Sequence, residues 1–261
     1  LIGIFSILRF NLAVPQEACP MEIGINLAGP ADWGSEYPFV NVFKYARQWI
    51  THNHPNYVGD KPWDTGFTDQ MPVDAQGYPL EVPFRVGGAD TAQVVRTVWA
   101  NAIDLATGTY TLLYDGTGTI EFWGNARTIS TVPGRIEVEV IGGPNNQGDI
   151  IAMEIRESQA GDHIHNIRFL LPETEDSYSE DVYSQEWLDK LAPFRTIRFM
   201  DWGHTNGSRL KHWNDRPKMD DYSYTIDGVP YEFFIELSNK QQANPWVCIP
   251  HLADENYVRQ M

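Results

Sequence analysis

The chain has 261 residues with 42% apolar and 13% aromatic side chains, including nine Trp, and a formal net charge of −16. This length suffices for one large domain or two modest ones, and the composition suffices for a buried core. An acidic surface repels phosphate backbones, which argues against nucleic acid as a partner and suits a neutral ligand. No apolar stretch is long enough to cross a membrane, so we expect no membrane partner.

The two cysteines, Cys19 and Cys248, are too few for a disulfide framework, and their redox state stays open. Cys248 lies in an apolar run and is expected to be a buried thiol. The apolar start of the chain, Leu1 to Ala13, is compatible with the remnant of a signal peptide, although Arg9 interrupts it. We therefore expect a secreted or cell-surface protein.

Residues 21–83 are predicted to form a first strand–helix unit. A short strand is expected over residues 22–27, and Pro38 suits the first turn of a helix that follows. The helix is predicted from apolar residues at helical spacing, namely Phe39, Val42, Phe43, Ala46, Trp49 and Ile50. The stretch from Asn53 to Pro83 is rich in Pro, Gly and Asp and is predicted to be a loop.

Residues 84–171 change to a period of two. Residues 136–140, 151–155 and 167–171 alternate apolar and polar side chains, and β-rich runs cover 94–99, 109–114 and 119–123. Turn signals such as Asp115-Gly116 and Gly142-Gly143 separate these runs. Many short strands at regular spacing predict an inserted antiparallel β-sandwich.

Residues 172–261 return to alternating strand and helix. Strands are expected at 196–200 and 246–249, a helix at 231–242, and a last helix from Glu255 capped by Asp254. This alternation predicts a parallel sheet. The fold class is therefore α/β plus all-β, with one α/β domain interrupted by the sandwich.

Polar and aromatic residues gather where the three expected parallel strands end. Function gathers at this edge of a (β/α) barrel, although polar loops cap every barrel and that alternative stays open. These side chains hydrogen-bond and stack on sugars. The candidate substrate-binding residues are Asn26, Asp32, Trp33, Arg198, Asp201, Trp202, Asn206 and His251.

Four segments together resemble bacterial proteins related to the clan A glycoside hydrolases. They are Gly24–Leu27, Ala31–Trp33, Arg198–Trp202 with Thr205–Asn206, and Pro245–His251. The resemblance implies the first three units of a (β/α)8 TIM-type barrel, and a hydrolase that processes a β-linked polysaccharide. It also implies that Arg198 and His251 line a sugar-binding cleft beside the catalytic carboxylates.

The sequence departs from this family at the catalytic residues. The family's acid/base Glu follows an Asn at the end of strand four, and its nucleophilic Glu ends strand seven. We find no Asn-Glu strand end, and Asp254-Glu255-Asn256 has the wrong order. Glycoside hydrolysis needs two carboxylates, so the catalytic residues stay unassigned and the chain is interpreted as a fragment of a longer enzyme. Its open sheet edge predicts a possible homo-oligomer.

Two other functions stay open. In a non-catalytic carbohydrate-binding protein the sandwich would carry the sugar site, through Trp99, Tyr110, Tyr114, Phe122 and Trp123. In a structural protein the sandwich would serve assembly.

No cofactor or metal is expected. The pairs His163/His165 and His52/His54 are weak metal signals, and packing is the better explanation for the first pair. The acidic run from Glu173 to Asp181 lacks a calcium-loop pattern and is better explained as a solvated loop.

Overall fold

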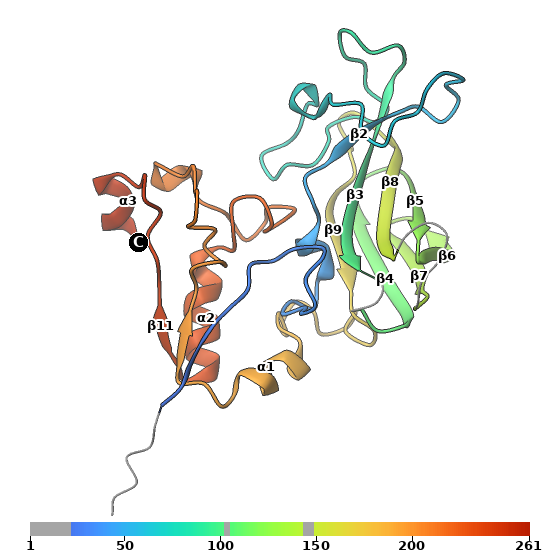
Figure 1. Ribbon diagram of the computed structural model, residues 1–261. Helices are drawn as coiled ribbons and strands as arrows, with labels where there is room; N and C mark the ends of the chain where they lie inside the picture. The colour runs from blue at the N-terminus through green and yellow to red at the C-terminus, as the bar shows by residue number, and fades with distance from the viewer. Residues whose placement is uncertain (1–21, 102–104, 143–148) are drawn as a thin grey trace, which may run out of the picture.

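The computed structural model describes residues 22–101, 105–142 and 149–261 and shows one parallel and two antiparallel sheets (Figure 1). The strands are β1 (Gly24–Asn26), β2 (Ile50–Asn53), β3 (Gln93–Asn101), β4 (Gly108–Asp115), β5 (Gly118–Gly124), β6 (Ala126–Val132), β7 (Arg135–Val140), β8 (Ile150–Ser158), β9 (His165–Leu170), β10 (Thr196–Arg198) and β11 (Asn244–Trp246). The α-helices are α1 (Gln185–Leu191), α2 (Tyr231–Gln241) and α3 (Glu255–Gln260), and short 3-10 helices cover Val42–Tyr45, Thr68–Gln70 and Trp213–Asp215. Within the described residues, no helix has both the length and the apolar character needed to cross a bilayer.

The parallel sheet has the order β1-β10-β11, which confirms the predicted parallel arrangement, although the third strand covers Asn244–Trp246 and not residues 246–249. Helix α2 covers one face of the sheet: the Phe234 ring stacks on Phe199, just beyond β10, at 4.4 Å, and Ile197 is fully buried. No closed barrel forms in the described part of the chain, where β1 and β11 are the two edges of this sheet. The opposite face of the sheet is left uncovered by α2.

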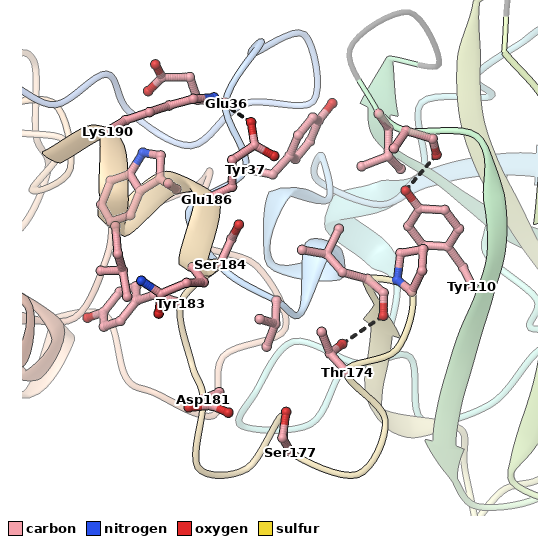
Figure 2. A pocket seen from close by; sticks show the side chains of 18 of the residues that line it. Glu36, Tyr37, Tyr110, Thr174, Ser177, Asp181, Tyr183, Ser184, Glu186 and Lys190 are labelled. Atoms are coloured by element: carbon pink, nitrogen blue, oxygen red, sulfur yellow. Dashed lines mark hydrogen bonds and ion pairs between the residues drawn. The ribbon is translucent and has the colours of Figure 1, made fainter.

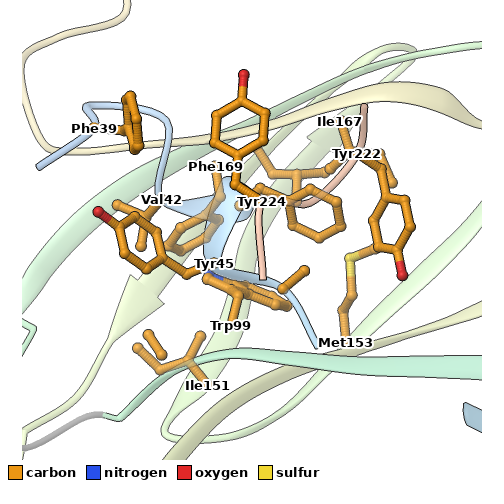
Figure 3. Packing of buried hydrophobic residues seen from close by; sticks show 14 of the residues in the cluster. Phe39, Val42, Tyr45, Trp99, Ile151, Met153, Ile167, Phe169, Tyr222 and Tyr224 are labelled. Atoms are coloured by element: carbon orange, nitrogen blue, oxygen red, sulfur yellow. The ribbon is translucent and has the colours of Figure 1, made fainter. Parts of the chain in front are cut away.

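The antiparallel strands form two four-stranded sheets, β2-β3-β8-β5 and β6-β7-β4-β9. Their inner faces meet through aromatic side chains: Phe169 of β9 lies 5.0 Å from Trp99 of β3 and stacks on Tyr110 of β4 at 5.1 Å. Figure 3 shows Trp99 and Phe169 in this core. The prediction of antiparallel strands within residues 84–171 is confirmed, while the division of the chain into 21–83, 84–171 and 172–261 stays a prediction.

The helix predicted over residues 39–50 is wrong. Only Val42–Tyr45 forms a short 3-10 helix, and Ile50–Asn53 becomes β2, which pairs antiparallel with β3. The segment lies between the two parts of the molecule, so its apolar residues are buried on several sides without sharing a helical face. Asn41 fixes the irregular backbone, since its Oδ1 accepts hydrogen bonds from the backbone N–H of Phe43 and of Phe169.

Phe39 joins the α/β part of the molecule to the rest of the core. Its ring stacks on Trp202 and Tyr183 at 5.5 and 5.6 Å and meets Phe233 and Tyr224 edge-on at 5.3 and 5.4 Å. Figure 3 shows Phe39, Tyr45 and Tyr224 among the buried residues of this cluster. The core is therefore continuous across the molecule.

The structure tests the predicted burial of only one of the two cysteines. Cys248 is partly exposed and free, because it follows the edge strand β11, so its predicted burial is wrong. Cys19 and the apolar start of the chain lie outside the described residues.

Candidate functional site

Three side chains stand in one row across the uncovered face of the parallel sheet. Asn26, Arg198 and Trp246 are register partners on β1, β10 and β11, and residues paired across a parallel sheet share a face. Asn26 and Trp246 are exposed, the indole by 56%, and Arg198 is partly exposed. Because each residue ends its strand, the row marks the carboxyl edge of the sheet, where the sequence placed the site.

The guanidinium of Arg198 lies over the indole ring of Trp246. The guanidinium carbon is 5.1 Å from the ring centroid, which is a cation–π distance. Nη1 donates to Asn26 Oδ1 at 3.5 Å and Nη2 to Met200 Sδ at 3.0 Å, whereas the buried Nε has no partner. Within the described residues no carboxylate forms an ion pair with Arg198, so the guanidinium keeps donors for an incoming acceptor.

Asp201 completes the cluster from the segment that follows β10. Its Oδ2 accepts a hydrogen bond from Asn26 Nδ2 at 2.7 Å, so the ends of β1 and β10 are tied together. Gly29 makes this approach possible, since a Cβ at that position would lie 2.9 Å from the carbonyl oxygen of Asp201. Asn206 is exposed nearby, with Nδ2 3.9 Å from Met200 Sδ.

The other residues predicted after β1 have different environments. Asp32 is only 2% exposed and forms an ion pair with Arg47 at 2.6 Å, so its carboxylate is already engaged. Trp33 is 72% exposed, with the Arg47 guanidinium 5.9 Å from its ring. Of these two residues, only Trp33 presents a free surface to a ligand.

Trp202 is almost fully buried. It is 1% exposed and stacks on Trp187 at 5.8 Å, with Phe39 and Phe199 against it. It also lines a small cavity beside the end of β1. Its predicted part in substrate binding stays a prediction.

His251 is exposed in the turn that follows β11. In the described part of the chain, no hydrogen bond or ion pair joins it to Arg198 or Asn26, which contact each other. Its predicted place beside Arg198 stays a prediction.

Trp246 is the site residue that sequence reasoning missed. It was assigned to the third parallel strand without a role in binding. Its position one strand across from Arg198 could be found only with the register, which places Pro245 opposite Ile197 and Trp246 opposite Arg198.

The aromatic residues proposed for a sugar site on the sandwich mostly form its core. Trp99 and Tyr110 are fully buried, Tyr114 is 7% exposed, and Phe122 packs against the same cluster. Trp123 lies partly exposed instead, 4.7 Å from Trp63. Trp99 and Tyr114 therefore offer little surface to a ligand, Tyr110 lines a cavity at the edge of the sandwich, and the alternative of a sugar site on the sandwich stays a prediction.

The histidine and acidic signals have structural partners. His163 Nε2 lies 2.8 Å from Asp74 Oδ2, and the His163 and His165 rings are 5.0 Å apart. Glu175 forms an ion pair with Arg135 at 2.7 Å, and the pKa of Glu175 is lowered, first by this hydrogen bond. Among the described residues no group of three His, Cys, Asp or Glu side chains is arranged to hold a metal ion.

Comparisons of the chain with protein-family models, with curated proteins and with solved structures give no match. The function is therefore inferred from the geometry of the site.

Proposed function

We propose that this protein is glycoside hydrolase-like and binds a neutral, β-linked polysaccharide on the uncovered face of its parallel sheet. The row formed by Asn26, Arg198 and Trp246 carries this proposal. It combines an exposed indole with amide and guanidinium donors at the carboxyl edge of parallel strands. Sugar rings present apolar C–H faces to an aromatic ring and hydroxyl oxygens to such donors.

The charge of the molecule supports a neutral ligand. The net charge of −16 repels polyanions. Within the cluster, Asn26 contacts both Asp201 and Arg198, so the negative charge of Asp201 offsets the positive charge of Arg198. A uronic-acid polymer or a nucleic acid would meet unfavourable long-range electrostatics. A glucan, xylan or mannan would not.

Binding, rather than bond cleavage, is the role proposed for these residues. Glycoside hydrolysis needs a proton donor and a second carboxylate on opposite sides of the scissile bond. Asp201 is the carboxylate hydrogen-bonded within the row, and Asp32 is held by Arg47. Because both carboxylates are engaged in these contacts, the catalytic residues of the proposed hydrolase are not assigned within this cluster.

The test is calorimetric titration with neutral β-1,4-glucan, β-1,3-glucan and xylan oligosaccharides. We expect Trp246→Ala to weaken binding roughly three- to tenfold, because stacking is lost, and Trp246→Phe to retain most of the affinity. Ile235→Ala removes another exposed apolar side chain, on α2, and should leave binding unchanged. Affinity that is the same in Trp246→Ala and in the parent would contradict the proposal.

A further inference from the structure

Two cavities meet at Glu36, on the segment that follows β1. The larger, of about 470 Å³, lies between α1, residues 35–40 and the 171–184 connection from the sandwich. Figure 2 shows Glu186 and Lys190 on one side of it and Tyr110 on the other. The smaller, of about 310 Å³, lies beside the end of β1 and is lined by Asn26 and Tyr45.

The two cavities share the lining residues Ser35, Glu36 and Trp187, so they adjoin, and together they are called the groove below. The groove begins at Asn26, which belongs to the row on the parallel sheet, and ends against the sandwich. Volumes of this size lie within the usual range of small-molecule sites, about 300–1,000 Å³. A ligand that extends from the sheet face past Asn26 therefore meets the smaller cavity first and the larger one beyond Glu36.

Tyr45 presents an unsatisfied hydrogen-bonding group on the wall of this groove. Its side chain is 1% exposed, and its hydroxyl lies near the backbone of Phe39 without completing a hydrogen bond. Burial, with smaller effects from Tyr37 and Glu36, raises the pKa of Tyr45, so the hydroxyl keeps its proton. A buried polar group without a partner costs free energy in the unliganded protein. A ligand oxygen would remove that cost.

The rest of the lining carries more carboxylates than cations. Glu36, Asp181 and Glu186 are exposed on the walls, Lys190 is held by Glu186 at 2.9 Å, and Lys240 is a second, exposed lysine. Tyr37 adds a partly exposed ring. Carboxylates accept hydrogen bonds from hydroxyl groups and repel anions, which selects a neutral polyhydroxylated ligand.

We propose that this groove binds a second stretch of a neutral oligosaccharide, which continues from Asn26 past Glu36 and the Tyr45 hydroxyl towards the sandwich. The choice of ligand rests on the proposed function of the sheet face. The position of the groove depends only on its lining residues and not on the proposed function.

The experiment is calorimetric titration of the intact chain with β-linked gluco- and xylo-oligosaccharides of two to six units. Tyr45→Phe should lower the affinity for the longest oligosaccharides roughly three- to tenfold, as expected for one lost hydrogen bond. Glu36→Gln should lower it in the same range. Thermal unfolding of Tyr45→Phe should show equal or higher stability, because the deleted hydroxyl has no partner.

Two matched variants serve as controls. Tyr224→Phe removes a buried hydroxyl that donates to Met219 O at 2.8 Å and does not line the groove, so it should lower stability and leave affinity unchanged. Glu81→Gln removes an exposed carboxylate elsewhere and should change neither quantity.

The outcomes separate this inference from the proposed function. Loss of affinity in Trp246→Ala with no loss in Tyr45→Phe or Glu36→Gln overturns the groove and keeps the sheet face. Loss of affinity in Tyr45→Phe and Glu36→Gln with no loss in Trp246→Ala supports binding in the groove and overturns the proposed binding on the sheet face. A parent protein that binds no oligosaccharide of the panel overturns both.

Discussion

Asn26 Nδ2 donates a 2.7 Å hydrogen bond to Asp201 Oδ2, across 175 residues of sequence. The bond fixes the edge of the parallel sheet by joining the end of β1 to the segment after β10. It also holds the Asn26 amide where Arg198 Nη1 contacts Oδ1. The two sides of the candidate site are thus connected through one side chain.

Replacement of Asn26 should therefore affect binding more than folding. We expect Asn26→Ala to reduce oligosaccharide affinity several-fold and the free energy of unfolding by only about 0.5–1.5 kcal/mol, the usual contribution of one hydrogen bond. Calorimetric titration and urea unfolding measure the two effects. A stability loss several times larger, with unchanged affinity, would show that the bond is purely structural.

The chain should hydrolyse glycosides little or not at all. Soluble β-glucans and aryl glycosides are suitable substrates, with Asp32→Asn, Asp201→Asn and Arg198→Ala measured beside the parent. Robust turnover that Asp201→Asn abolishes would make Asp201 catalytic. Turnover that survives all three substitutions would move the active site elsewhere in the molecule.

Phe39→Ala should be strongly destabilising. The ring is 2% exposed and contacts Trp202, Tyr183, Phe233 and Tyr224, so its removal leaves a cavity where the two parts of the core join. A loss of about 3–5 kcal/mol in the free energy of unfolding is expected. Phe39→Leu should cost clearly less. A loss below about 1 kcal/mol in Phe39→Ala would mean that this junction is not well packed.

Arg47→Ala should also lower stability, because it leaves the buried carboxylate of Asp32 without its cation. Asp32 is 3% exposed at its side chain and pairs with Arg47, and its second oxygen has no partner. A buried carboxylate that loses its cation costs about 3–5 kcal/mol, less where solvent reaches it, as the half-exposed Arg47 allows. The double variant Arg47→Ala/Asp32→Asn should recover part of the loss in denaturant unfolding.

Stability should rise between about pH 8 and 10. Burial lowers the pKa of Lys44 from 10.5 to about 8, despite the opposing carboxylates of Asp221 and Asp220. In this range the folded lysine has lost its proton and the unfolded one retains it, so the unfolded state binds more protons and folding gains with pH. Lys44→Met should abolish the rise, as measured by urea unfolding at successive pH values.

Above about pH 10 the trend should reverse. Burial raises the pKa of Tyr78, Tyr183 and Tyr224 above 10.0, so these side chains ionise in the unfolded state while the folded state keeps their protons. The folded state then binds more protons and stability falls as pH rises. A stability that keeps rising well beyond this pH would contradict the burial of these phenols.

The sequence by itself determined those strands and helices that are specified by local signals, such as the alternation of apolar residues or a helix-capping residue. Alternation predicted β7, where Ile136, Val138 and Val140 are buried, and the cap at Asp254 predicted α3, whose Tyr257 N–H it binds at 2.7 Å. The order of strand and helix predicted that β1, β10 and β11 lie parallel. These features depend on neighbours along the chain, which the sequence displays.

Only the tertiary structure decided what lies between those elements. Residues 39–50 are buried between two parts of the molecule, so their apolar spacing results from burial on several sides and not from one face of a helix. Trp202 and Trp246 look alike in sequence, yet the first is enclosed by Trp187 and the second stands exposed beside Arg198. The groove at Glu36 and the unpaired Tyr45 hydroxyl likewise arise from segments far apart in the chain. Burial and register are set by distant contacts, and periodicity along one strand or helix does not encode them.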